Sequence, residues 1–181
     1  MLYKSLFATI LFASLFSALA QAEPRTVPFV DVNRYIAGPW YEISANPMPF
    51  EKDCTCSRQV LGLESDGRLN VRNTCNDKTQ RGPVREVKGF ATNDDTASNA
   101  KFTVDFGFPI KGKYWIIALD PAYQWAVVSD PTELSLFVLS KTPTLDPALY
   151  DAAIAEASSA GQVDTSKLVS MQQTGCSYPA Q

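Results

Sequence analysis

The sequence predicts an all-β protein: an eight-stranded up-and-down antiparallel β-barrel with one C-terminal α-helix packed on its outside. Three observations lead to this fold class. Eight short segments with strand character follow one another, the turns between them carry Gly, Pro, Asn and Asp, and one amphipathic helical segment comes only after the last of them. Sequential antiparallel strands joined by short turns favour closure into an up-and-down barrel.

The first 22 residues have the features of a signal peptide that is cleaved from the mature chain. Lys4 supplies a positive start, residues 6–19 are apolar, and the small residues at 18–22 offer an A-x-A cleavage site. The apolar run is short for a membrane span, which disfavours the alternative of an uncleaved anchor. We therefore expect a single domain over residues 23–181 that is either periplasmic or secreted. No feature of the sequence distinguishes between these two locations.

Each expected strand has its own signal in the sequence. The first begins at Trp40 after a Gly-Pro turn, and Asp66-Gly67 forms the tip of the hairpin between the second and third. In the fifth, apolar Phe102, Val104 and Phe106 alternate with polar neighbours, which is the period of a strand with one buried face. The eight segments are residues 39–46, 56–64, 69–75, 85–92, 100–106, 113–119, 124–129 and 133–140.

The single helix is expected to begin at Asp146, a good N-cap residue, followed by Pro147 at the first helical position. Its apolar stripe consists of Leu149, Tyr150, Ala153, Ile154 and Ala157, and Gly161 ends it. A lone amphipathic helix that follows eight strands must pack on the outside of the sheet. A short last strand is expected within residues 168–173.

Four cysteines in an exported chain indicate two disulfides. A Cys54–Cys56 bond would close a strained ring, so two pairings remain. If the hairpin loop is 64–67, Leu63 faces Arg68 and Cys56 faces Cys75, which favours Cys56–Cys75 together with Cys54–Cys176. A two-residue loop would shift the register by two, so Cys54–Cys75 with Cys56–Cys176 stays open.

The composition excludes several kinds of chemistry. The chain has no histidine, which removes the usual general base, the Ser-His-Asp and Cys-His pairs, and histidine-ligated haem. Zinc is a poor alternative for the cysteines, so we expect no metal and no cofactor. Without Lys4 the chain has 15 basic and 19 acidic residues and no basic run, which argues against nucleic acid as a partner.

Five segments resemble the lipocalin family, in particular bacterial lipocalins and apolipoprotein D-like secreted lipocalins. The segment YIAGPWYEI at 35–43 resembles the G-x-W-Y-E-I signature that opens the first strand of lipocalins. The others are DGRLNV at 66–71, YWIIALD at 114–120, WAVVSDP at 125–131 followed by LFVLSKTP at 136–143, and VDTSKLVSMQQ at 163–173. They occur in family order and span residues 30–173, nearly the whole mature chain.

The resemblance assigns a structural role to three residues at one end of the barrel. Gly38 and Trp40 match the G-x-W pair, whose tryptophan points inward and closes the barrel floor in lipocalins. Lys141 stands where most members carry an arginine that packs across this tryptophan. Lysine keeps a cation–π contact but loses the planar stacking of a guanidinium, so we expect a weaker floor contact.

The resemblance also implies non-covalent binding of a small hydrophobic ligand, such as a fatty acid, lysophospholipid, sterol or pigment. An eight-stranded barrel holds either packed side chains or one small ligand, so a solid core is the alternative. Met48 and Phe50, in the loop after the first strand, are candidates to contact the ligand or a membrane surface, with a role as ordinary loop anchors as the alternative. The expected wall residues are Phe102, Val104, Phe106, Phe137, Tyr114 and Trp115, with the last two competing for the inward face of one strand.

Two other classes of function compete with ligand carriage. The barrel could be an interaction or membrane-associated module with a vestigial cavity. It could also be an isomerase that uses a free cysteine, although paired cysteines are simpler and we expect no enzymatic activity. The sequence does not define the ligand or the oligomeric state.

Overall fold

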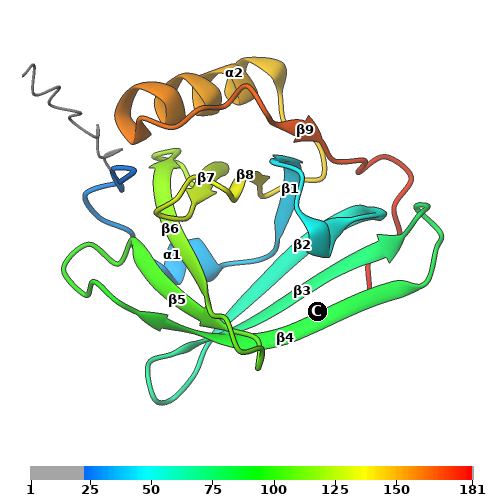
Figure 1. Ribbon diagram of the computed structural model, residues 1–181, viewed down its shortest axis with the longest axis horizontal. Coiled ribbons are helices and arrows are strands. Elements are labelled where there is room, and N and C mark those ends of the chain that lie inside the picture. The colour runs from blue at the N-terminus through cyan, green and yellow to red at the C-terminus, as the bar shows by residue number, and fades with distance from the viewer. Residues whose placement is uncertain (1–22, 181) are drawn as a thin grey trace, which may run out of the picture.

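Eight antiparallel strands close into an up-and-down barrel, as the sequence predicted, with one long helix outside it (Figure 1). The structure is a computed structural model that describes residues 23–180; the expected signal peptide, residues 1–22, lies outside the described residues. The barrel strands are β1 (Trp40–Ala45), β2 (Cys54–Leu63), β3 (Leu69–Asp77), β4 (Val84–Asn93), β5 (Lys101–Asp105), β6 (Gly112–Leu119), β7 (Trp125–Ser129) and β8 (Leu136–Ser140). The remaining elements are α1 (Val32–Ile36), η1 (Pro49–Glu51), α2 (Pro147–Glu156), η2 (Ala157–Gly161) and β9 (Val169–Ser170).

The barrel closes between β1 and β2 through a short ladder. β2 pairs with β1 only at Trp40↔Gln59 and Tyr41↔Arg58, at the end of the barrel near α1. Further along β1, the C-terminal β9 pairs with Ser44 and Ala45 instead. The edge of β1 is therefore shared between β2 and a segment of the C-terminal tail, which leaves few of its backbone groups unpaired.

Gln173, just after β9, bridges β1 and β2 where their own ladder ends. Its Nε2 donates to the backbone oxygen of Glu42 in β1 at 2.8 Å and to that of Ser57 in β2 at 2.7 Å. Tyr178 in turn donates its hydroxyl hydrogen to Oε1 of Gln173 at 2.6 Å. One buried amide thus continues the hydrogen bonding of the sheet across the seam.

The sheet has two apolar faces, each with its own cluster of buried side chains. One cluster lies in the barrel interior and includes Trp40, Phe102 and Ile116. The other lies between β6–β8 and α2. The predicted helical stripe packs in this outer cluster, with Ala153 and Ala157 fully buried, so α2 covers the outside of the barrel as expected.

The helix differs from the prediction at its C-terminal end, and a second helix was missed. After α2 the chain makes the π-helical turn η2 through Gly161, and the left-handed cap residue is Gln162 with φ +62°. Gly161 packs instead against Ile117, where a Cβ would stand 3.1 Å from Cδ1. The segment before the Gly-Pro turn, for which the sequence predicted no helix, forms α1, whose N-cap Asp31 accepts hydrogen bonds from two backbone N–H groups.

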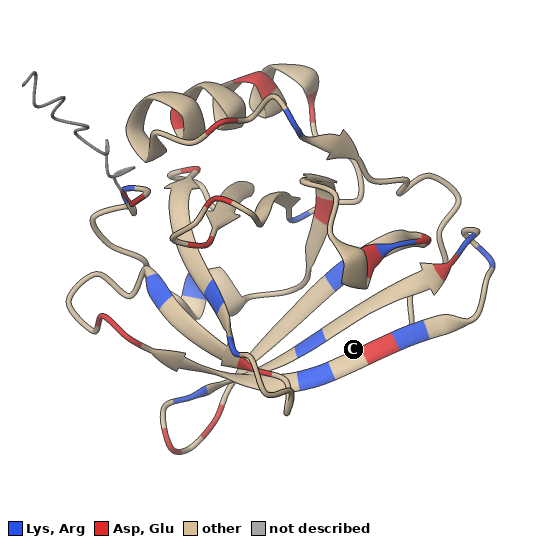
Figure 2. Cartoon of the chain, in the orientation of Figure 1, with Lys and Arg blue, Asp and Glu red and all other residues tan. Residues whose placement is uncertain are grey.

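No helix within residues 23–180 is both long and apolar enough to cross a membrane. Charged residues are scattered over the chain, and residues of both signs stand close together along β4 (Figure 2).

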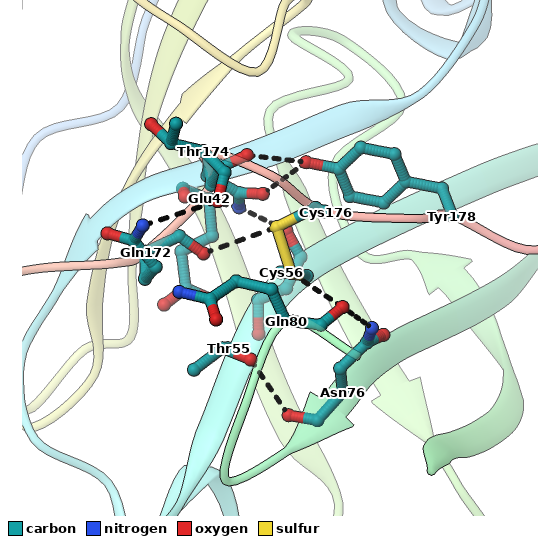
Figure 3. Close-up of a disulfide and its surroundings, with 11 residues drawn as sticks. Glu42, Thr55, Cys56, Asn76, Gln80, Gln172, Thr174, Cys176 and Tyr178 are labelled. Carbon is teal, nitrogen blue, oxygen red and sulfur yellow. Dashed lines mark hydrogen bonds between the residues drawn. A yellow bond between two sulfur atoms is a disulfide. The ribbon is translucent and has the colours of Figure 1, made fainter. Parts of the chain in front are cut away.

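The favoured disulfide pairing, Cys56–Cys75 with Cys54–Cys176, is wrong. The structure contains the pairing that stayed open, Cys54–Cys75 with Cys56–Cys176. Figure 3 shows the second of these bonds. The first reason is the register of the β2–β3 hairpin. Leu63 pairs with Leu69 and not, as expected, with Arg68, so the strands are shifted by one residue. A bulge between Thr55 and Arg58 removes this shift, and the expected register holds only at Cys54 and Thr55.

The bulge also turns Cys56 away from β3. Cys56 has φ +59°, and its N–H donates to Gln172 in the tail rather than to β3. Its side chain therefore meets Cys176, while Cys54 reaches Cys75 diagonally across the β2–β3 ladder. The consequence is that the long-range bond fixes the tail beside the β1–β2 seam.

We predict that the two disulfides contribute unequally to stability. Replacing both Cys56 and Cys176 by serine opens a loop with a sequence separation of 120, whereas replacing Cys54 and Cys75 opens one of 21. The chain-entropy model assigns about 5 and about 3 kcal/mol to loops of these lengths. Urea unfolding of the two double variants should show the larger loss for the first, and equal losses would contradict the prediction.

Candidate functional site

The floor of the barrel is built from α1 and the start of β1. Trp40 is fully buried, and its ring centroid lies 4.9 Å from that of Tyr35 in α1. Its indole Nε1 donates to the backbone oxygen of Tyr35 at 2.9 Å. Gly38, with φ +77°, makes the turn between α1 and β1 that a side chain at this position would strain. These contacts place the largest side chain of the chain across one end of the barrel.

Lys141 holds the floor from the end of β8. Its Nζ lies 3.9 Å from the centroid of the Trp40 ring and donates to the backbone oxygens of Tyr35 and Ala37, both at 2.8 Å. Burial lowers the pKa of Lys141 to about 8. The carbonyl oxygens and the ring face act in the opposite direction, because they stabilise the ammonium form.

The inner wall contains most of the expected ligand-binding residues. Phe102 and Val104 are buried in the inner cluster. Phe106, Tyr114 and Phe137 pack against the same cluster but are only half-buried. The buried members lie toward the floor, whereas Phe106 and Phe137 lie at the opposite end, which we call the mouth. The apolar wall therefore continues from a filled floor into a region where its side chains keep accessible surface.

Trp115 does not belong to this wall, which corrects the expectation. It is 7% exposed and packs in the outer cluster. Lys101 places its Nζ 4.0 Å from the Trp115 ring centroid on the same outer face. Tyr114 is the inward residue of the two, since it pairs with the inward-facing Phe102. The sequence could not separate them, because β6 is apolar on both faces.

The loop between β1 and β2 lies at the mouth, and its two predicted site residues differ in environment. Met48 is half-buried, whereas Phe50 is 61% exposed in η1. Arg85 at the mouth end of β4 donates to the backbone oxygens of Phe50 and Lys52, which ties this loop to β4. Phe50 therefore belongs to the rim of the barrel.

A short chain of polar groups crosses the interior just above the floor. The hydroxyls of Tyr35 and Tyr114 hydrogen-bond at 2.7 Å, and the Tyr114 hydroxyl donates to Oε1 of Gln59 at 2.9 Å. Burial raises the pKa of both tyrosines, so both stay neutral over the ordinary pH range. The three polar groups use one another as hydrogen-bond partners and need none from a ligand. We therefore count them as part of the floor.

Two carboxyl groups meet inside the barrel, which the sequence did not reveal. Glu42 in β1 pairs with the inward-facing Leu139 of β8 and is 5% exposed. The Glu51 carboxyl, carried by η1, hydrogen-bonds the Glu42 carboxyl. Burial raises the pKa of both groups, and the neighbouring Glu51 charge raises that of Glu42 further. Glu42 stood in the sequence as the acidic residue of the segment YIAGPWYEI, and Glu51 as the one that ends the otherwise apolar segment PMPFE, but neither pattern indicated that the two would meet.

A surface groove of about 670 Å³ lies outside the barrel, along the β4–β5 seam. Its lining includes outward residues of these strands, such as Phe90 and Thr103, together with Lys111 of the following loop. Arg68 stacks on Phe90, with its guanidinium carbon 4.3 Å from the ring centroid. Phe106, at the mouth end of the inner wall, also belongs to the lining, so the groove meets the inner wall at this residue.

The described residues offer neither a thiol nor a metal site. All four cysteines are in disulfides, so the free nucleophile that an isomerase of this kind would need is absent. No group of three or more His, Cys, Asp or Glu side chains within residues 23–180 is placed to hold a metal ion.

Comparison with known proteins gives one consistent result. A family model described as a lipocalin-like domain matches residues 30–173. The outer membrane lipoprotein Blc of Escherichia coli is 35% identical over 155 residues, which cover 84% of this chain and 86% of Blc. Apolipoprotein D of Bos taurus is 29% identical over 81% of this chain and 78% of its own. The solved structure of insecticyanin from Manduca sexta shares the fold, with TM-score 0.66 at 18% identity over 84% of each chain.

We predict that Lys141→Met lowers the free energy of unfolding by about 1–3 kcal/mol, because it removes a half-buried cation–π contact and the ammonium hydrogen bonds to the backbone oxygens of Tyr35 and Ala37. Lys101→Met is the matched control, since that ammonium lies at 4.0 Å from Trp115 and makes no hydrogen bond to a backbone oxygen. Its loss should be below about 1 kcal/mol. Urea unfolding measures both variants, and an equal loss would show that the floor hydrogen bonds contribute nothing.

Proposed function

Because the chain belongs to the lipocalin family, we propose that it binds a small hydrophobic molecule inside the barrel and carries it, as part of the transport or maintenance of membrane lipids. The observation that carries the proposal is the gradient along the inner wall. Trp40 and Tyr35 at the floor are almost fully buried, whereas Phe106 and Phe137 at the mouth end of the wall are apolar and only half-buried. A closed floor with an accessible apolar wall is the geometry that a guest entering from the mouth requires.

The energetics of such a site are adequate for carriage. Burial of an acyl chain contributes up to about 0.8 kcal/mol per methylene. The loss of rigid-body and chain freedom offsets several kcal/mol of this gain. Binding in the micromolar to nanomolar range is the expected outcome, and no catalytic group is needed for it.

The proposal includes export of the chain to the periplasm or the exterior. Two disulfides join all four cysteines, and such bonds persist in oxidising compartments. The related Blc is described as an outer membrane lipoprotein, and this description supports a location outside the inner membrane for this chain as well.

We further propose that the mouth contacts a lipid bilayer while the ligand enters or leaves. Four large apolar side chains on three mouth loops are 61–88% exposed: Phe50, Phe108, Ile110 and Leu134. These loops join β1 to β2, β5 to β6 and β7 to β8, and the up-and-down order places them at one end of the barrel. Exposed apolar side chains at the entrance favour a surface of neutral lipid over a strongly anionic one.

We predict that Phe137→Asp abolishes saturable binding of the neutral apolar fluorophore N-phenyl-1-naphthylamine, because it places a charge on the inner wall. Phe90→Asp is the matched control: Phe90 is 41% exposed on the outer face of β4, and its variant should bind as the unmodified protein does. Fluorescence titration measures both, with circular dichroism to verify the fold. Unchanged binding by Phe137→Asp would place the site elsewhere, and no binding by the unmodified protein would refute carriage.

We predict that the double variant Phe108→Ser, Ile110→Ser loses most of its co-sedimentation with phosphatidylcholine vesicles. Each large apolar side chain contributes about 1.5–3 kcal/mol when it is transferred from water. Phe29→Ser with Leu63→Ser is the control, since both residues are more than half exposed at the floor end. Equal co-sedimentation of the two double variants would contradict membrane contact through the mouth.

A further inference from the structure

The position of Glu42 is unusual for an acidic residue. It lies one inward position beyond Trp40 on β1 and pairs with Leu139 of the inner cluster, so its side chain enters the barrel rather than the solvent. It is 5% exposed, and acidic side chains are rarely buried to this extent without a partner.

No cation of the protein compensates this charge. None of the ion pairs among residues 23–180 includes Glu42 or Glu51. The neighbour of Glu42 is instead a second acid, Glu51, which reaches it from the mouth loop. Two adjacent carboxyl groups cannot both be charged in an apolar environment, so in the free protein they share a proton.

Two buried oxygen atoms on strands of this part of the barrel lack a hydrogen-bond donor. Apart from the shared proton, Oε1 of Glu42 has no hydrogen-bond partner, and it is shielded from solvent. Oδ1 of Asn73 in β3 has none either. Asn73 pairs with Gln59 of β2, whose side chain belongs to the interior polar chain. The interior thus contains oxygen atoms that lack a hydrogen-bond donor. A ligand group that carries positive charge and donates several hydrogen bonds would satisfy them.

We propose that the Glu42–Glu51 pair is the polar end of the ligand site and selects a molecule with a protonated amine on an apolar body. This inference rests on the proposed carriage function and specifies its ligand. The ammonium replaces the shared proton, so both carboxyl groups become charged and each gains a donor. The apolar part lies along the wall formed by Val104, Phe106 and Phe137. Glu51, on the mouth loop between β1 and β2, also couples the occupied site to the rim.

The test compares two ligands that differ only in the head group. Dodecylamine and dodecanol, below their micellar concentrations, are titrated into the full mature protein by isothermal titration calorimetry at neutral pH. We expect dodecylamine to bind about tenfold or more tightly, because hydrogen bonds to charged groups are the stronger ones. In Glu42→Gln and in Glu51→Gln this preference should fall to within about threefold, while dodecanol binds as before, which also shows that the barrel has folded.

Glu156→Gln, on the exposed surface of α2, is the matched control and should keep the preference for the amine. Equal affinities of the unmodified protein for amine and alcohol would overturn the inference and leave carriage intact. So would a preference that survives both glutamine variants. Failure of both molecules and of N-phenyl-1-naphthylamine to bind would overturn carriage itself and the inference with it.

Discussion

The closure of the sheet between β1 and β2 is the constraint on which the rest of the structure depends. A barrel has no edges only if every strand is paired on both sides, and β1, which pairs with β8 at four positions on one side, shares just two residue pairs with β2 on the other. The C-terminal tail supplies what the short ladder lacks: β9 pairs with β1, and the buried amide of Gln173 hydrogen-bonds both strands. The Cys56–Cys176 disulfide fixes that tail in place, close to Tyr178 (Figure 3). The seam is thus held by residues more than a hundred positions away in the chain.

This closure also explains the asymmetry of the two ends. Where β1 and β2 are paired directly, Trp40 lies across the interior and Lys141 fixes it to α1 through backbone oxygens. Where they separate, the connecting loop has room to turn inward, and Glu51 reaches Glu42. A sealed floor and an adaptable mouth arise from one feature of the topology. The apolar wall, the carboxyl pair and the exposed rim side chains then occupy successive levels between these two ends.

Much of the fold was predictable because it follows from local periodicity. Alternation of apolar residues defined β5, the Asp66-Gly67 turn defined the β2–β3 hairpin, and the stripe from Leu149 to Ala157 defined a helix with one buried face. The G-x-W motif located Trp40 through a family resemblance rather than through any local pattern. The short helix α1 escaped prediction because five residues carry too little periodicity to distinguish a helix from a turn.

What the sequence by itself determined is which face of most strands is apolar, where the chain turns, and that its cysteines form bonds. Only the tertiary structure decided which cysteine meets which, because a bulge at Cys56 changes the register that a regular ladder would keep. It also decided that Tyr114 rather than Trp115 faces inward, since β6 is covered on both sides, and that two distant glutamates become neighbours. Periodicity is a property of neighbouring residues, whereas bulges, seams and buried charge pairs depend on which segments the closed barrel brings together.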